Sequence, residues 1–227
     1  MSRLDRYQFG HGATPWGFGV GRTLGRVARI LLVCGSLGGA SANRRALDVV
    51  AERLATHEGV IVDRLDDVGP IPPLDPAQQD PPPVVVGEWL GQIAAADAVV
   101  IAAPEYAGAL AGVAKNALDW VVGGGQLYAK PVVVLSAGTT GGQQARIDLV
   151  RTLSWQGAHV VGHLGIAAPK TKSDADGRFT DPATVAELHG LADLAAAAPL
   201  LDGQHRLVLV RATTEWAGVG AERIAPI

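Results

Sequence analysis

Short apolar runs alternate with helical patterns from Val27 onward, and this alternation constrains the fold more than any other feature. The run at 30–34 is continuous and apolar, which is typical of a strand buried on both faces of a sheet. Strands that alternate with helices indicate a parallel sheet covered on both faces, with right-handed crossovers. The pattern predicts strands at 28–34, 60–64, 98–103, 131–137 and 160–168, and helices at 42–57, 84–95, 110–122, 143–156 and 182–198.

Both ends of the chain lie outside this repeat, so we expect one α/β domain at 27–202. Residues 1–26 are rich in glycine without sustained periodicity, and we interpret them as a flexible leader. Their glycine spacing imitates a dinucleotide fingerprint but has no strand before it and no helix after it. Residues 66–83 are rich in proline and are predicted to form a surface loop. The C-terminal extension, 203–227, contains one strand-like run at 206–211.

Composition excludes several classes of function. A net charge of −3 gives no electrostatic basis for binding nucleic acid or an anionic membrane. The single cysteine, Cys34, excludes an intramolecular disulfide and fits a reducing compartment, and the six histidines show no metal-ligand spacing. No apolar run reaches the ~18 residues of a membrane span, and the N-terminus lacks a secretory pattern. We therefore expect a soluble cytoplasmic protein without a metal, in which Cys34 acts as a small buried apolar residue.

The loop at 35–41 joins the first strand to the first helix and contains three glycines and two serines. Ser41 is placed to cap the helix. A glycine-rich loop that leads into a helix N-terminus presents free backbone N–H groups and the positive end of the helix dipole, which suits an anion. The loop has no Lys or Arg, so its donors are neutral, with Ser36 and Asn43 among them. An ordinary βα turn with helix-cap chemistry explains the loop equally well.

Two more unusual loops follow the third and fourth predicted strands. Pro104 ends the third strand, and Tyr106 offers a flat apolar face with a polar tip beside small residues at 107–112. Residues 136–142 are rich in glycine and hydroxyl groups. In an open parallel sheet, ligands bind at the carboxyl ends of the strands, where the strand order reverses. We therefore expect the three loops to converge on a phosphorylated, flat heterocycle.

Three motifs in this order resemble the NADPH-dependent FMN reductase family, flavodoxin-like proteins that include quinone, azo-dye and chromate reductases. Residues 35–43 match the family's loop Gly-Ser-Leu-Arg-x-x-Ser-x-Asn. The second motif is Pro104-Glu-Tyr followed by residues 112–120, and the third is 136–142. The resemblance covers roughly residues 28–165. It implies a flavodoxin-like fold with a five-stranded parallel sheet in the order 2-1-3-4-5 and helices on both faces.

The resemblance also assigns roles by position. Residues of the first motif would hold the FMN phosphate, those of the second would line the isoalloxazine and ribityl region, and those of the third would contact the pyrimidine side of the ring. No protein residue is assigned to catalysis, because N5 of the flavin carries the chemistry. The implied cofactor-binding residues are Ser36, Gly38, Ser41, Ala42, Asn43, Pro104, Glu105, Tyr106, Ala107, Ser136, Gly138 and Gly141.

The sequence departs from the family pattern at both ends of this predicted site. Gly38 replaces the arginine of the phosphate loop, and Arg44 or Arg45 is the candidate to replace its charge. Ala107 replaces the asparagine after Pro-Glu-Tyr. Losing the arginine removes a charge-assisted contact of about 1.5–3 kcal/mol, so these departures weaken the expected affinity for FMN.

The function implied by the resemblance is that of an NAD(P)H-dependent FMN reductase or quinone reductase. A hydride would pass from NADPH or NADH through FMN to a quinone, a flavin or another soluble acceptor, and the protein would form a homodimer or homotetramer. The alternative, motivated by Gly38 and Ala107, is a flavodoxin-like module without enzymatic activity, either an electron carrier or a cofactor-free binding protein. Flavodoxins are usually strongly acidic, so a net charge of −3 argues against the carrier.

Charged side chains near these loops also have plainer interpretations. Glu105 is assigned to cofactor binding, but a glutamate there also suits a cap on the following helix or a support for nearby backbone. Asp148 and Arg151, on the predicted helix 143–156, are interpreted as charges that face solvent.

Overall fold

The central sheet of the protein is parallel and has five strands. The computed structural model describes residues 27–226. The strands lie in the order β2-β1-β3-β6-β7. Because these are the first five predicted strands in chain order, the predicted order 2-1-3-4-5 is confirmed. Their bounds are β1 Ala28–Cys34, β2 Val60–Leu65, β3 Ala98–Ala102, β6 Pro131–Gly138 and β7 His159–Ala167.

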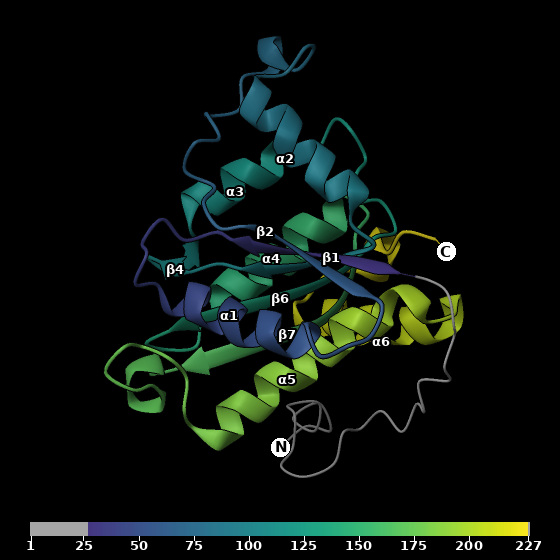
Figure 1. The fold of residues 1–227 in the computed structure, drawn as a ribbon. Helices are drawn as coiled ribbons and strands as arrows, with labels where there is room; N and C mark the ends of the chain where they lie inside the picture. Colours follow the sequence, from purple (N-terminus) through teal and green to yellow (C-terminus); the bar gives the residue numbers. More distant parts are fainter. Residues whose placement is uncertain (1–26, 227) are drawn as a thin grey trace.

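Helices cover both faces of the sheet (Figure 1). Helices α1 (Ala42–Leu54) and α5 (Pro182–Ala197) pack on one face, and α2 (Val84–Ala95), α3 (Gly112–Asp119) and α4 (Gln143–Trp155) pack on the other. Side chains alternate between the faces along each strand, so in β1 Leu32 lies in one core cluster and Leu31 in the other. This explains why the strands are apolar at nearly every position.

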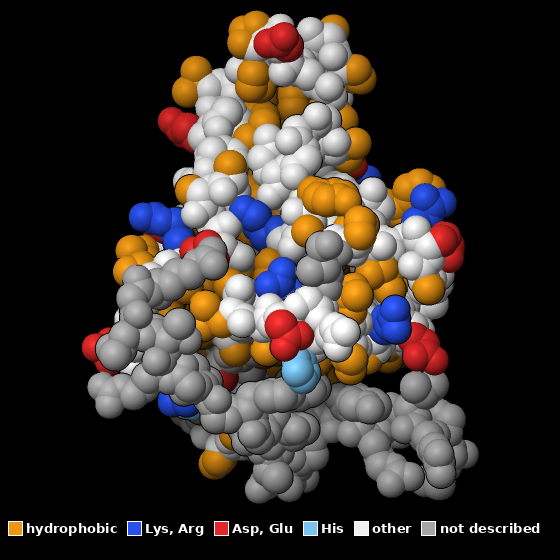
Figure 2. Space-filling view, turned by 90° about the vertical axis from the view of Figure 1, so that its right-hand side faces the viewer, with side chains coloured by type: hydrophobic (Ala, Val, Ile, Leu, Met, Phe, Trp, Pro, Cys, Tyr) orange, Lys and Arg blue, Asp and Glu red, His pale blue; other side chains and the backbone are white. Residues whose placement is uncertain are grey.

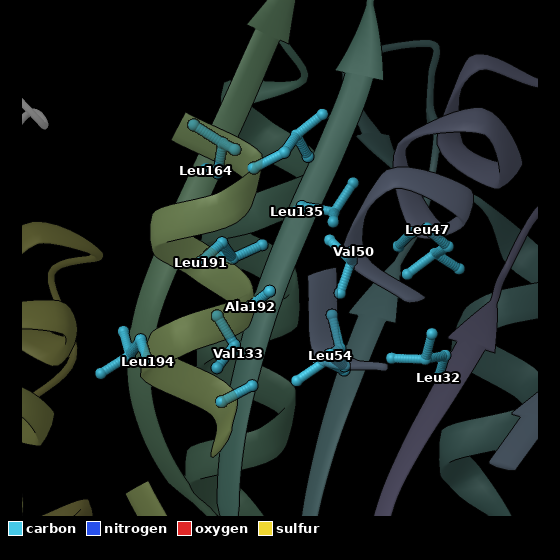
Figure 3. Packing of buried hydrophobic residues seen from close by; sticks show 14 of the residues in the cluster. Leu32, Leu47, Val50, Leu54, Val133, Leu135, Leu164, Leu191, Ala192 and Leu194 are labelled. Atoms are coloured by element: carbon cyan, nitrogen blue, oxygen red, sulfur yellow. The ribbon is translucent and has the colours of Figure 1, made fainter. Parts of the chain in front are cut away.

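The core under α1 fixes the start of that helix at the edge of the sheet. Leu47, Val50 and Leu54 of α1 lie in the same core cluster as Leu191 and Ala192 of α5, and all five are fully buried (Figure 3). Each such leucine contributes about 1.5–3 kcal/mol through burial. With the body of α1 held in this way, its N-terminus lies beside the carboxyl ends of the strands. The predicted cap is confirmed, because Ser41 Oγ accepts a hydrogen bond from Asn43 N at 3.2 Å.

A small hairpin that the sequence analysis did not predict follows β3. It consists of β4 (Glu105–Tyr106) and β5 (Ala109–Leu110), paired antiparallel. Its presence delays the next helix, which was expected over 110–122 and instead begins at Gly112. Most of the apolar positions predicted for that helix lie in it, but the first belongs to the hairpin.

The run at 206–211 is helical, so the prediction of a strand there was wrong. It lies inside α6 (Gly203–Trp216), whose N-cap Asp202 accepts a hydrogen bond from His205 N at 3.0 Å. The apolar and β-branched run resembles a strand locally. Its buried positions, Leu209, Val210, Thr213 and Thr214, recur instead at helical spacing. The helix packs beside the edge strand β7, so tertiary packing overrides the local β preference.

The proline-rich segment 66–83 is less exposed than predicted. Val68 and Ile71 are buried. The carbonyl oxygen of Pro72 accepts hydrogen bonds from Trp120 Nε1 and Asn116 Nδ2, each at 2.8 Å. The segment is therefore a surface loop as predicted, but Val68 and Ile71 are buried and its first half is attached to α3 and the C-terminal end of that helix. The leader and the glycine pattern expected in residues 1–26 lie outside the described residues.

The described residues, 27–226, bear on the expectations about a membrane span, a metal site, surface charge and Cys34. No helix in that range is long and apolar enough to span a bilayer. The same residues contain no cluster of three or more His, Cys, Asp or Glu arranged to hold a metal ion. On the face shown in Figure 2, basic and acidic side chains are interspersed. Cys34 is buried, and burial raises the pKa of its thiol, which fits the expected apolar role better than that of a nucleophile.

A stack of three side chains joins the C-terminal helix to the rest of the fold. Arg146 of α4 donates from Nη1 to His163 Nδ1 of β7 at 2.8 Å. The His163 ring stacks on Trp216 of α6 with centroids 3.7 Å apart, and the Arg146 guanidinium lies 5.0 Å from the Trp216 ring. An arginine can only donate, so His163 accepts as the neutral ring. Burial and the neighbouring Arg146 lower the pKa of His163 to about 4.

We expect the His163→Gln variant to lose part of the acid sensitivity of the fold. Between about pH 6.5 and pH 4 the unfolded chain binds a proton at His163 that the folded chain excludes, so the free energy of unfolding falls as the pH falls. Glutamine keeps an acceptor for Arg146 but does not titrate. The wild type should lose about 2–3 kcal/mol more than the variant across this window. Urea unfolding at a series of pH values measures this difference, and parallel profiles would contradict it.

Candidate active site

The loops after β1, β3 and β6 meet at the carboxyl edge of the sheet, as predicted. Gly35 N donates to the carbonyl oxygen of Ala102 at 2.7 Å, and Ala103 N donates to that of Leu135 at 3.1 Å. A Cβ atom on Gly35 would lie 2.8 Å from the Cβ of Ala114, so this glycine allows the first loop to approach α3. The three strand ends are neighbours in the sheet, and their loops form one continuous surface.

The loop before α1 has the features of an anion site. Within residues 27–226, the backbone N–H groups of 37–40 donate to no other group. Side chains added at Gly38 or Gly39 would meet nothing within 4 Å, so open space lies beside these donors. Ser36 is buried below the loop, and Ala42 begins the helix. Free N–H groups at the N-terminus of a long helix attract a phosphate or carboxylate.

Asn43 connects the first loop to the fourth predicted strand. Its Oδ1 accepts from Ala137 N at 2.9 Å, and its Nδ2 donates to the carbonyl oxygen of Ala137 at 3.2 Å. The side chain is almost fully buried. These contacts join the start of α1 to the end of β6, and the predicted contact of Asn43 with a phosphate stays a prediction.

The two arginines proposed to replace the missing loop charge are engaged elsewhere. Arg44 donates to the carbonyl oxygen of Asp66, and its Nη1 lies 3.3 Å from an Asp66 carboxylate oxygen. Arg45 Nη1 lies 3.6 Å from a carboxylate oxygen of Asp48. The expected replacement is therefore not supported, and the donors in the described loop are neutral.

The hairpin after β3 presents Tyr106 at its tip. Ala107 and Gly108 connect the two strands and both have positive φ, at 52° and 71°. Two residues with positive φ between paired strands form a type I′ turn, for which Asn-Gly is the preferred sequence. The Tyr106 side chain is 62% exposed, so its ring is available to a ligand. Pro104 is buried below the hairpin, and its carbonyl oxygen accepts from Ala111 N at 3.2 Å.

Glu105 caps a helix, but not the one that follows it in the chain. Its Oε2 accepts from Gln144 N at 2.8 Å and from Ala145 N at 3.1 Å. Helix α4 starts at Gly142, which has no side chain to cap it, so Glu105 supplies the cap from the hairpin. The carboxylate also sits favourably at the positive end of the helix dipole. The contacts of Glu105 therefore agree with its interpretation as a support for nearby backbone. A direct contact with the cofactor stays a prediction.

The loop after β6 is shaped by closely packed small residues. Ser136 is fully buried, and its hydroxyl has no hydrogen-bond partner within the described residues. A Cβ atom on Gly142 would lie 2.0 Å from Ser136 Oγ, so only glycine allows the helix to start over this serine. Gly141 N donates to the carbonyl oxygen of Gly138 at 3.1 Å. Ser136 thus lies under the loop, while Gly138, at the strand end, is partly exposed.

Two charged residues of α4 lie beside the candidate site and contact neighbouring protein groups, although the sequence analysis assigned them no role. Arg146 places a cation in the first turn, where burial lowers its pKa. Asp148, expected to face solvent, has both carboxylate oxygens engaged and a side chain only 22% exposed. Arg151, by contrast, is exposed as expected. The partner of Asp148 is a backbone group of the hairpin, which no pattern of side chains reveals.

Comparison with known proteins assigns this chain to a family. Residues 28–172 match the family described as NADPH-dependent FMN reductase. The chain belongs to this family. An NAD(P)H-dependent FMN reductase of Pseudomonas aeruginosa is 36% identical over 105 residues, which are 44% of this chain and 57% of that protein. An Oryza sativa subsp. japonica protein named “Probable NADPH:quinone oxidoreductase 2” is 28% identical over 180 residues, 74% of this chain and 87% of its own length.

Solved structures support the fold of this family member. FerB of Paracoccus denitrificans, a flavoenzyme NAD(P)H:(acceptor) oxidoreductase, superposes with a TM-score of 0.60 at 24% identity, over 83% of this chain and 98% of FerB. An azoreductase of Bacillus anthracis superposes with a TM-score of 0.56 at 16% identity, over 74% of this chain and 98% of that chain. At these identities the likeness shows the flavodoxin-like fold. The family, its enzyme relatives and their names give FMN and NAD(P)H as the cofactors.

We expect the Asn43→Ala variant to be strongly destabilised. The change leaves the buried N–H and carbonyl groups of Ala137 without partners, at about 2–4 kcal/mol in total. Urea unfolding measures the loss, and Arg45→Ala, on the same helix turn but at the surface, is the control. A free energy of unfolding within about 0.5 kcal/mol of the wild type would show that the Asn43 contact contributes little.

We expect Ala107→Asn to stabilise the protein by about 0.5–1 kcal/mol. Ala107 holds a φ of 52°, which an L-residue adopts at a cost, whereas asparagine tolerates it. Ala109→Asn is the matched control, because Ala109 lies in β5, and asparagine is unfavourable in strands. Thermal unfolding compares the two variants. If both lower the midpoint, the turn does not limit stability.

Proposed function

We propose that this protein is an FMN-dependent NAD(P)H oxidoreductase that delivers electrons from NADPH or NADH to a soluble acceptor such as a quinone or a flavin. One observation carries the proposal: free backbone donors at the N-terminus of α1 lie at the carboxyl edge of the sheet, where the loops after β3 and β6 also meet. In an open α/β sheet this edge is the ligand-binding position. The names of the relatives support the reaction class.

The loop before α1 suits the phosphate end of the cofactor. The backbone N–H groups of 37–40 supply donors, and Ser41 and Ser36 add hydroxyl groups nearby. Asn43 keeps this loop in register with the end of β6 through Ala137. Because the described loop offers only neutral donors, the backbone and the helix dipole contribute most of the attraction for the phosphate.

The hairpin and the loop after β6 suit the ring end. Bound FMN supplies hydride transfer at its N5, so the protein needs to hold the ring and leave one face open. Tyr106 presents an exposed aromatic face on one side. The N-terminus of α4 lies beside Gly138 and Gly141, with Arg146 in its first turn. Backbone N–H groups of the loop after β6, placed near the pyrimidine ring, would favour the negative charge that the ring gains on reduction.

Two parts of the proposal rest on the sequence alone. The homodimeric or homotetrameric state is implied by the family resemblance, and the cytoplasmic location is an expectation from composition. Light scattering tests the first, because a mass equal to one 23.4 kDa chain contradicts an oligomer. The choice between NADPH and NADH and the identity of the acceptor are properties that steady-state assays would establish.

We expect the purified protein to retain added FMN through desalting, with flavin absorbance that bleaches under anaerobic NADPH. The Gly38→Arg variant should bind FMN roughly tenfold more tightly, because it restores a charge-assisted phosphate contact where the loop has open space. Titration of the apoprotein with FMN, followed by quenching of flavin fluorescence, measures both affinities.

A charge-matched control separates a local contact from a general effect of charge. Gly87→Arg, at an open position on α2, adds the same charge away from the site and should leave the affinity unchanged. Failure of the wild type to retain FMN or to bleach with NADPH or NADH would overturn the proposed function and favour a cofactor-free binding protein.

A further inference from the structure

The hairpin that presents Tyr106 has little intrinsic stability. Its strands have two residues each, pairing Glu105 with Leu110 and Tyr106 with Ala109. Its turn places a non-glycine residue, Ala107, at positive φ. Isolated two-stranded hairpins are at best marginally stable in water, even with favourable turns. Something outside the hairpin must therefore determine where Tyr106 lies.

Helix α4 supplies this support through two carboxylates, one that belongs to the hairpin and contacts the helix, and one that belongs to the helix and contacts the hairpin. Glu105 reaches from the hairpin to the N-terminus of the helix, where its Oε2 accepts from Gln144 N and Ala145 N. Asp148 reaches from the helix to the hairpin, where its Oδ2 accepts from Leu110 N at 2.9 Å. These contacts hold the hairpin at both of its strands, because Glu105 lies in β4 and its pairing partner Leu110 lies in β5.

We propose that Asp148 is a positioning residue that holds the Tyr106 hairpin against α4 and so shapes one wall of the cofactor site. The expected effect on FMN binding rests on the proposed function, whereas the contact between Asp148 and the hairpin does not depend on that function. Leu110 is buried, so its N–H group would have no partner without Asp148. An unpaired buried donor is unfavourable, and the hairpin would relieve it by moving towards water.

The remaining contacts of Asp148 indicate that it supports the hairpin rather than forming a surface ion pair. Its Oδ1 accepts from Gln144 Nε2 at 2.9 Å, which holds the carboxylate in the orientation that Leu110 requires. Arg151 approaches the same oxygen only to 3.8 Å, and its side chain is 54% exposed. Exposed pairs at this distance contribute little. The hydrogen bond to the hairpin, and not the charge pair, is therefore the contact that matters.

Three variants separate these contributions. Asp148→Ala removes both acceptors, Asp148→Asn keeps one acceptor for Leu110 N, and Arg151→Ala removes only the ion pair. Hydrogen exchange measures the Leu110 amide directly in the protein as purified. Fluorescence titration of the apoprotein measures FMN affinity, and NADPH oxidation with a quinone acceptor separates kcat from KM.

We expect Asp148→Ala to increase the exchange rate at Leu110 and to weaken FMN binding, each by about tenfold. At saturating FMN its kcat should stay near that of the wild type, because no reacting group is removed. Asp148→Asn and Arg151→Ala should behave like the wild type in exchange and in FMN affinity.

Other outcomes would overturn the proposal in distinguishable ways. Unchanged exchange at Leu110 in Asp148→Ala would show that the contact does not hold the hairpin. Faster exchange with unchanged FMN affinity would show that the hairpin does not shape the site. If Asp148→Asn fails as badly as Asp148→Ala, charge and not the hydrogen bond is responsible. A wild type that binds no FMN overturns the proposed function, and with it the role in binding.

Discussion

The paired hydrogen bonds between Asn43 and Ala137 are the contact on which the candidate site most depends. They join the start of α1 to the end of β6, two segments that are 94 residues apart in the chain and separated in the sheet by β3. Backbone pairing cannot make this connection, because β1 and β6 are not neighbours. Without it, the phosphate end and the ring end of the site would be connected only indirectly, through packing and through the hydrogen bonds that each makes to β3. With it, the anion loop has a fixed position relative to α4.

The segments around the candidate site share one feature: a side chain from one segment satisfies backbone groups of another. Asn43 serves Ala137, Glu105 serves the open end of α4, and Asp148 serves Leu110. Loops carry unpaired backbone groups that must find partners when they are buried. These contacts hold the segments against one another, while the N–H groups of 37–40 donate to no other group within residues 27–226. A residue of a family motif can thus be needed to hold the site in shape, while other residues make the contacts with a ligand.

Local signals in the sequence are sufficient for the five strands of the sheet and for the expectation that three loops converge at one edge, whereas the order 2-1-3-4-5 follows from the family resemblance. Continuous apolar runs mark buried parallel strands, and Ser41 marks the start of a helix. The strand predicted at 206–211 failed because four apolar residues between two arginines fit either structure until their packing partner is known. The hairpin was missed since its turn uses alanine where asparagine is the usual signal. Asp148 was missed because its partner is a distant backbone amide.

The two departures from the family pattern remove side chains and preserve backbone geometry. Gly38 lacks the arginine, yet the N–H groups of 37–40 remain free at the helix N-terminus. Ala107 lacks the asparagine amide, yet its positive φ keeps the turn that places Tyr106. Each backbone donor to a charged group contributes about 1.5–3 kcal/mol, as much as the lost arginine contact. The retained donors outnumber the lost contact, so the departures reduce affinity for an FMN phosphate without abolishing it. This balance favours a weakened flavoenzyme over a cofactor-free module.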